Sequence, residues 1–190
     1  MRLGLFGGTF NPLHLGHLLL AETARDVLAL DRVLFIPTNQ PPHKRAAELL
    51  PGPWRLKLLE LAIRDQPAFA VSDVELERPG PSYTIETVKI LRSRLPDAKL
   101  FLLVGADMLA VRWLAWKELK QLCTVAVVHR PGARPPRRET GLKWLAMPEV
   151  AIASSDIRAR LKAGRSIRYL VPSSVERFIR QHQLYTSKAH

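Results

Sequence analysis

The sequence predicts a doubly wound α/β fold, and three observations carry this prediction. The apolar run at 3–6 indicates a buried strand, and after the diglycine at 7–8 apolar side chains recur at helical spacing over 13–28. Residues 32–36 form a second apolar strand, which closes a parallel, right-handed β-α-β unit. The continuously apolar run at 99–104 is typical of a central parallel strand covered on both faces. We therefore expect a Rossmann-like, mainly parallel sheet with helices on both faces and a small C-terminal helical segment.

The remaining elements follow from periodicity and turn-forming residues. Pro53 suits the first turn of a helix, and Pro96 stops another. We expect further helices at 53–64, 82–95, 154–162 and 173–182, and extended segments at 69–76, 124–128, 142–145 and 150–152.

Length and composition predict one domain. The 190 residues are 47% hydrophobic, which suffices for one well-buried core but not for two full domains. We expect one domain over 1–190, with the helical segment at about 154–185 packed on it. No apolar run approaches the roughly 18 residues of a membrane span, and the N-terminus lacks a secretory pattern. The single cysteine, Cys123, lies in an apolar strand and suits a reducing compartment. We therefore expect a cytoplasmic protein without a membrane partner.

The charge balance favours anionic partners. The chain carries 29 lysines and arginines against 17 acidic residues, a formal net charge of +12. Nucleic acid and small phosphorylated molecules are both candidates. Nucleic acid is the secondary candidate, because no RNA-binding aromatic motif and no helix-turn-helix signature accompany the basic residues.

The first turn is the strongest candidate for a phosphate site. Gly7 and Gly8 let the backbone approach an anion, and the following helix presents its N-terminal N–H groups. His14 and His17 are three residues apart and share one face of a helix, and Gly16 leaves room for a nucleotide. The alternative is a simple glycine turn beside two surface histidines. The combination of all these residues at the end of a strand favours phosphate binding.

The tetrad His14-Leu15-Gly16-His17 resembles the His-x-Gly-His signature of the nucleotidylyltransferase superfamily. The longer pattern Gly-Gly-Thr-Phe-x-Pro-x-His-x-Gly-His is similar to that of the bacterial nicotinate mononucleotide adenylyltransferases. The resemblance recurs from residue 3 to about 185. It implies that Thr9 and Phe10 bind ATP together with the two glycines and the two histidines. It also implies that both histidines are catalytic.

Two segments resemble the family's substrate-binding regions. Residues 38–44 are rich in turn formers and follow a strand at the carboxyl edge of the sheet, where α/β proteins bind ligands. The resemblance implies that Asn39 and Lys44 contact the mononucleotide; a solvated basic loop is the alternative. The helix expected from residue 82 exposes N–H groups that can hold a carboxylate. Here the resemblance implies that Thr84, with Tyr83 beside it, binds the pyridine carboxylate; a plain helix start is the alternative.

A third motif follows the central strand at 99–104. The Asp107 carboxylate can accept hydrogen bonds from ribose hydroxyls or cap the next helix, and the family's Gly-x-Asp pattern, here Gly105 to Asp107, implies contact with ATP and with ribose. The indoles of Trp113 and Trp116 suit either stacking on a pyridine ring or core packing. The resemblance implies one stacking tryptophan; alignment favours Trp113, and the choice stays open.

A second phosphate site is expected near the C-terminus. Ser154 or Ser155 can cap the helix that follows, and Arg158 lies one turn on. The family pattern Ile-Ser-x-Thr-x-x-Arg matches here except at Ala153 and Ser155. The resemblance implies that both serines, Arg158 and the Arg130 of an Arg-Pro-Gly turn bind ATP, with Arg158 also catalytic.

Two phosphate sites at one sheet edge suggest a nucleoside triphosphate that is held from both sides. A phosphate monoester is already ionised near neutral pH, so in-line attack on the α-phosphate of ATP needs no general base. We expect Mg²⁺ held mainly by ATP phosphates and water, with no protein metal ligands. The resemblance implies ATP and nicotinate mononucleotide as substrates.

Several alternatives remain. They are an adenylyltransferase for nicotinamide mononucleotide or phosphopantetheine, a cytidylyltransferase, and a basic nucleotide- or RNA-binding module. The sequence leaves open both the preference between the acid and the amide and a homo-oligomeric state.

Overall fold

The computed structural model describes residues 1–42, 49–111, 113–129 and 140–186. Within these residues the core is a six-stranded sheet in the order β3-β2-β1-β4-β5-β6, and every strand pair is parallel. The strands are β1 (Arg2–Gly8), β2 (Arg32–Pro37), β3 (Phe69–Val71), β4 (Lys99–Gly105), β5 (Thr124–His129) and β6 (Lys143–Ala146). The chain runs outward from β1 through β2 and β3, and then from β4 through β5 and β6 on the other side. This is the expected doubly wound topology.

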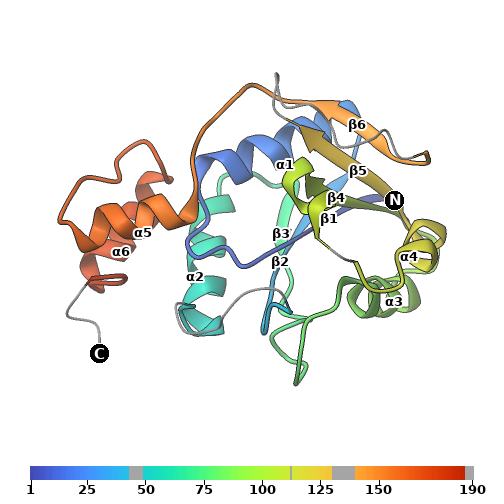
Figure 1. The fold of residues 1–190 in the computed structure, drawn as a ribbon, viewed down its shortest axis with the longest axis horizontal. Coiled ribbons are helices and arrows are strands. Elements are labelled where there is room, and N and C mark those ends of the chain that lie inside the picture. Colours follow the sequence, from blue (N-terminus) through green and yellow to red (C-terminus); the bar gives the residue numbers. More distant parts are fainter. Residues whose placement is uncertain (43–48, 112, 130–139, 187–190) are drawn as a thin grey trace.

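Helices cover both faces of the sheet (Figure 1). On one face lie α1 (Leu15–Val27) and α2 (Gly52–Ile63), and on the other lie α3 (Thr84–Arg94) and α4 (Trp116–Leu122). Alternate residues of β4 serve the two layers, because side chains alternate along a strand. Phe101 and Leu103 pack toward α1, whereas Leu100, Leu102 and Val104 pack toward α3. The uninterrupted apolar run of β4 is the consequence of burial on both sides.

The C-terminal helices pack beside α2 (Figure 1). These are α5 (Ser154–Lys162) and α6 (Ser173–Gln181). Leu58 of α2 lies in one buried cluster with Ile157 of α5 and with Val175 and Ile179 of α6. Val175 and Ile179 are four residues apart and face the same side of α6. The apolar face of this segment is therefore buried against α2.

The predictions of two extended segments, at 69–76 and 150–152, are wrong in whole or in part. The segment at 69–76 is a strand only over Phe69–Val71, because Asp73 then accepts a backbone hydrogen bond from Leu76 at 2.7 Å and the chain turns. Residues 150–152 form no strand, and Ile152 packs against the cluster of α5 and α6 instead. Among the described residues, no helix combines the length and apolar character needed to cross a membrane.

Candidate active site

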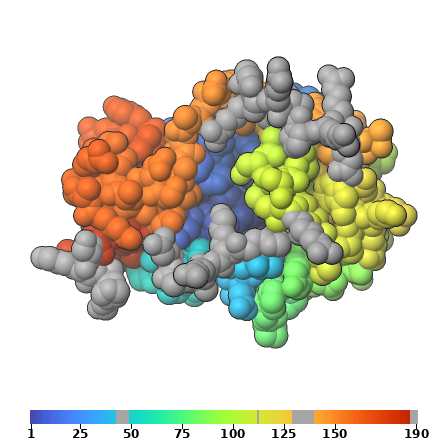
Figure 2. All heavy atoms as spheres, in the orientation of Figure 1, coloured from blue at the N-terminus to red at the C-terminus, as the bar shows by residue number. Residues whose placement is uncertain are grey.

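The first and third motifs flank the reversal point of the sheet. β1 and β4 are neighbours, and their carboxyl ends border the place where the strand order reverses. β1 leads to His14 and His17, whereas β4 leads to Asp107. Figure 2 shows the N-terminal segment (blue) between the C-terminal helices (orange) and the yellow-green residues that follow β4. The predicted motifs thus meet at one edge of the sheet.

The two histidines form a stacked pair at the start of α1. Their ring centroids lie 3.7 Å apart with 31° between the ring planes. The backbone N–H of His14 donates to Nδ1 of His17 at 3.2 Å, so a neutral His17 carries its proton on Nε2. A Cβ on Gly16 would lie 3.1 Å from Nδ1 of His14. Gly16 therefore makes room for the His14 ring, and both rings share one face as expected.

The two glycines before this pair have different surroundings. A Cβ on Gly7 would meet no atom of the described residues within 4 Å, whereas one on Gly8 would lie 3.0 to 3.3 Å from ring carbons of Phe10. Phe10 is buried, its φ is 43°, and its ring packs edge-on against His17 with centroids 5.2 Å apart. The side chain of Phe10 thus supports the histidine pair from inside the core. Gly7 leaves the open backbone that an anion could approach.

The start of α5 meets the first motif directly. Oγ of Ser154 donates to the carbonyl of Pro12 at 2.9 Å, and Nη1 of Arg158 donates to the carbonyl of Asn11 at 2.9 Å. The expectation that Ser154 or Ser155 caps α5 is wrong, since the N-cap residue is Ala153 and no side chain of the described residues caps the helix there. Ser155 is exposed on the first turn of α5. These two hydrogen bonds join α5 to the loop at 9–14. The bonded residues are 142 and 147 positions apart in the sequence.

Arg55 is a buried residue beside the candidate site that the sequence did not reveal. Its side chain is only 2% exposed, and it donates to the carbonyls of Leu50 (2.8 Å), Thr9 (3.0 Å) and Thr38 (2.7 Å). Burial lowers the pKa of its guanidinium. The arginine ties the chain after β1 to the chain after β2. Its spacing from Leu58 and Leu59 on the buried face of α2 is the signal that could have revealed it.

The predicted substrate segments lie side by side. The backbone N–H of Asn39 donates to Oγ of Ser82 at 3.1 Å, and its side-chain amide donates to the carbonyl of Arg78 at 3.0 Å. Tyr83 is the N-cap residue of α3, and Thr84 is its first residue. Among the described residues, no side chain caps this helix. Asn39 is thus joined to the segment that leads into the start of α3.

A buried carboxylate lies beneath this helix start. Oε1 of Glu75 accepts a hydrogen bond from Oγ1 of Thr87 at 2.7 Å. Oε2 is buried and has no hydrogen-bond partner among the described residues. Burial raises the pKa of the Glu75 carboxyl, although the hydroxyl of Thr87 opposes the shift.

Asp107 and the two tryptophans follow β4. Asp107 is exposed on η2 (Ala106–Ala110), and a Cβ on Gly105 would collide with its carboxylate. The indole N–H of Trp113 donates to the carbonyl of Met108 at 2.8 Å, and its ring lies 5.4 Å from that of Trp116. Trp113 is therefore tied to the short helix that carries Asp107, while Trp116 begins α4.

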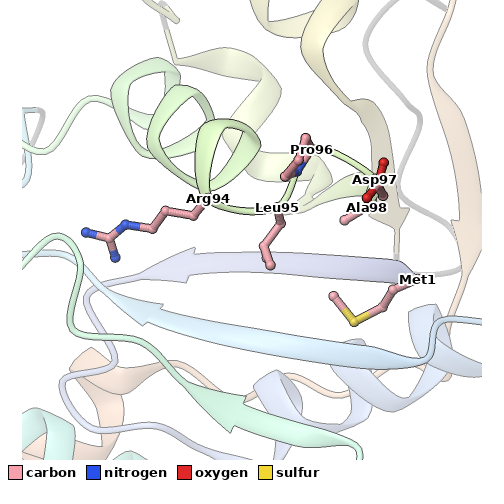
Figure 3. Close-up of a pocket in the computed structure, with 6 residues that line it drawn as sticks. All are labelled: Met1, Arg94, Leu95, Pro96, Asp97 and Ala98. Atoms are coloured by element: carbon pink, nitrogen blue, oxygen red, sulfur yellow. The ribbon is translucent and has the colours of Figure 1, made fainter.

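Lys44 and Arg130 lie outside the described residues. Within the described part of the chain, no cluster of three or more His, Cys, Asp and Glu side chains could hold a metal ion. A pocket of about 270 Å³ opens at the opposite edge of the sheet, between Met1 and the segment at 94–98, which begins with the last residue of α3 (Figure 3). It contains none of the predicted site residues.

Comparisons with known proteins agree over nearly the whole chain. Residues 5–160 match the model of the cytidylyltransferase-like family. A Thermus thermophilus protein named probable nicotinate-nucleotide adenylyltransferase is 48% identical over 189 residues, which cover 97% of this chain and 100% of the relative. A Symbiobacterium thermophilum protein of the same name is 44% identical over 197 residues, covering 97% and 95%.

A solved structure shares the fold. The nicotinic acid mononucleotide adenylyltransferase of Plasmodium falciparum, complexed with NaAD, is similar with a TM-score of 0.82 at 14% identity, covering 97% of both chains. At this identity the likeness shows a common fold.

Proposed function

Because this chain belongs to the cytidylyltransferase-like family, with full-length relatives among the nicotinate-nucleotide adenylyltransferases, we propose that it transfers adenylyl groups in NAD biosynthesis. ATP and nicotinate mononucleotide react to give nicotinate adenine dinucleotide and pyrophosphate. A phosphate oxygen of the mononucleotide forms a bond to the α-phosphorus of ATP. The bond from that phosphorus to the bridging oxygen breaks, and pyrophosphate leaves with the electron pair.

The observation that carries the proposal is the meeting of two donor-rich motifs around one loop. His14 and His17 lie at the start of α1, and Ser154 and Arg158 reach the same loop from α5. Imidazole, guanidinium and helix N–H groups all donate to phosphate oxygens. A triphosphate at the carboxyl end of β1 would therefore find donors on both sides.

These residues suit a reaction that needs alignment and charge dispersal. The attacking phosphate monoester is already ionised near neutral pH, so no protein base has to remove a proton. The Nε2–H of His17 and the guanidinium of Arg158 would bind oxygens on which charge develops. Backbone N–H groups exposed at Gly7 would contact the phosphate chain.

The mononucleotide would lie toward α3. Backbone N–H groups at Tyr83 and Thr84 would hold the pyridine carboxylate, as the positive end of a helix favours an anion. Asn39 would border the same subsite, Asp107 would accept hydrogen bonds from ribose, and Trp113 would stack on the pyridine ring.

A divalent cation fits this donor set only through the substrates. His14, His17 and Arg158 bring nitrogen groups to the loop rather than the carboxylate oxygens that Mg²⁺ prefers. Mg²⁺ held by phosphates and water would offset the charge of the departing pyrophosphate. Residues 1–190 would act as one catalytic unit, since α2 shares its buried cluster with α5 and α6. Consumption of ATP fits the cytoplasmic location expected from the sequence.

The test is pyrophosphate release with ATP and Mg²⁺ in parallel reactions. These contain nicotinate mononucleotide, nicotinamide mononucleotide or phosphopantetheine. We expect rapid release with the first compound and much slower release with the other two. Faster release with nicotinamide mononucleotide or phosphopantetheine would reassign the substrate. No pyrophosphate release with any of the three compounds would overturn the proposed reaction.

A further inference from the structure

The last described turn of the chain reaches back to the first motif. The hydroxyl of Tyr185 donates to Oδ1 of Asn11 at 2.9 Å, across a separation of 174 residues. The two residues are 8% and 3% exposed. The same Oδ1 accepts the backbone N–H of Leu50 at 3.2 Å. Asn11 thus joins three distant segments, and Tyr185 lies beyond the residues 5–160 that match the family model.

Both ends of this contact lie in unusual backbone. After α6, Gln183 and Tyr185 have φ angles of 50° and 63°, and Phe10, which precedes Asn11, has a φ of 43°. Bulky side chains rarely adopt this left-handed region, and they persist there only where the surrounding structure holds them. The backbone N–H of Leu184 donates to the carbonyl of Ile179 at 3.0 Å, which closes the end of α6. The turn at 182–186 is thereby built to direct the Tyr185 ring inward.

Asn11 lies in the loop at 9–14, which leads to the histidine pair, and hydrogen bonds from distant segments end on this loop. Its carbonyl accepts the hydrogen bond from Arg158, and the carbonyl of Thr9 accepts one from Arg55. Burial raises the pKa of the Tyr185 hydroxyl, which keeps its proton available for donation. The loop at 9–14 is therefore held from α2, from α5 and from the C-terminal turn.

We propose that Tyr185 is a positioning residue for the transfer reaction. Its hydrogen bond to Asn11 holds residues 9–14 so that His14 and His17 face the triphosphate. The C-terminal turn is then part of the apparatus that binds ATP and not only a packing element. This inference rests on the proposed function, but the state of the loop can be measured without any reaction.

The test compares Tyr185→Phe with Thr186→Ala. Both variants remove one hydroxyl from the same turn, but Oγ1 of Thr186 donates within the turn, to the carbonyl of Gln183 at 2.8 Å. For Tyr185→Phe we expect kcat/KM for ATP to fall about 5- to 10-fold, the scale of one buried hydrogen bond. Amide hydrogen exchange over residues 9–17 should become faster by a similar factor. Thr186→Ala should match the wild type in both measurements.

A purely structural role predicts a different pattern. A lower melting temperature for Tyr185→Phe, with exchange over 9–17 and kcat/KM for ATP both within twofold of wild type, would overturn the proposal. If the wild type releases no pyrophosphate, the proposed function fails, while hydrogen exchange still decides the role of Tyr185. Should Tyr185→Phe not fold, Asn11→Ala removes the same hydrogen bond from the other side, together with the one that Oδ1 accepts from Leu50. Faster exchange over 12–17 would then support the proposal, and unchanged exchange would refute it.

Discussion

The imidazole rings of His14 and His17 stack with their centroids 3.7 Å apart, and the backbone of one residue holds the ring of the other. The two rings therefore form one unit at the start of α1, and the Nε2–H of a neutral His17 is a hydrogen-bond donor of that unit. Rigid donors aimed at developing charge are the protein groups that most accelerate such transfers.

His17→Ala should lower kcat by about 100- to 1000-fold, because a donor to the transition state is lost. Its circular dichroism spectrum should stay that of the wild type. His182→Ala is the matched control, since His182 stacks on Phe178 at the end of α6, 4.3 Å between centroids, and belongs to no predicted site. A folded His17→Ala enzyme with full turnover would refute the catalytic role.

Gly7→Ala and Gly8→Ala should distinguish a glycine that lets phosphate approach the backbone from a glycine that is needed for core packing. The added Cβ at position 8 would press on Phe10, so we expect the free energy of unfolding to fall by about 1–3 kcal/mol. The Cβ at position 7 meets no atom within 4 Å in the described part of the chain, so stability should change by less than about 0.5 kcal/mol. If phosphates approach there, the Kd for ATP, measured by calorimetry, should rise about tenfold. Unchanged ATP affinity in Gly7→Ala would favour a simple turn.

Arg55→Met should destabilise the fold by about 3 kcal/mol. The change leaves the carbonyls of Thr9, Thr38 and Leu50 without their buried donor. Urea unfolding measures the loss. Arg64→Ala is the control, because Arg64 and its partner Asp65 are exposed, and its effect should stay below about 0.5 kcal/mol. Equal losses for the two variants would contradict the bridging role of Arg55.

Glu75→Gln should change how stability depends on pH. Burial raises the pKa of Glu75 above its ordinary 4.5, so the folded state holds this proton more tightly than the unfolded state. The stabilisation is complete below the ordinary pKa and is lost as pH rises through the folded pKa. As the pH rises above about 4.5, the free energy of unfolding of the wild type should therefore fall relative to that of Glu75→Gln. Urea unfolding at several pH values measures this difference. The exposed Glu60→Gln serves as control, and parallel wild-type and Glu75→Gln curves would oppose the prediction.

Trp113→Ala and Trp116→Ala should differ in their kinetics. Trp113 is bonded to η2, which carries Asp107, so its loss should raise KM for nicotinate mononucleotide about 3- to 10-fold. Trp116→Ala should chiefly lower the melting temperature, because its ring packs at the start of α4. A larger rise in KM for Trp116→Ala would assign the stacking to that residue instead.

The sequence by itself determined the fold and the place of the first motif. The apolar runs of β1, β2, β4 and β5 predict parallel strands because burial on two faces requires continuous apolar sequence. The three-residue spacing of His14 and His17 likewise predicts a shared helix face, since helical geometry relates near neighbours. The ligand roles of these residues stay predictions, which the variants above test.

Only the tertiary structure decided what holds that motif in place. Arg55 donates hydrogen bonds to carbonyls 17 and 46 residues away. Ser154 donates to the carbonyl of Pro12 instead of capping α5, and the hydroxyl of Tyr185 donates to Asn11 near the other end of the chain. Such contacts depend on how α2, α5 and the C-terminal turn dock on the sheet. Local periodicity encodes which face of a helix is buried, but it does not encode which distant carbonyl that face will meet.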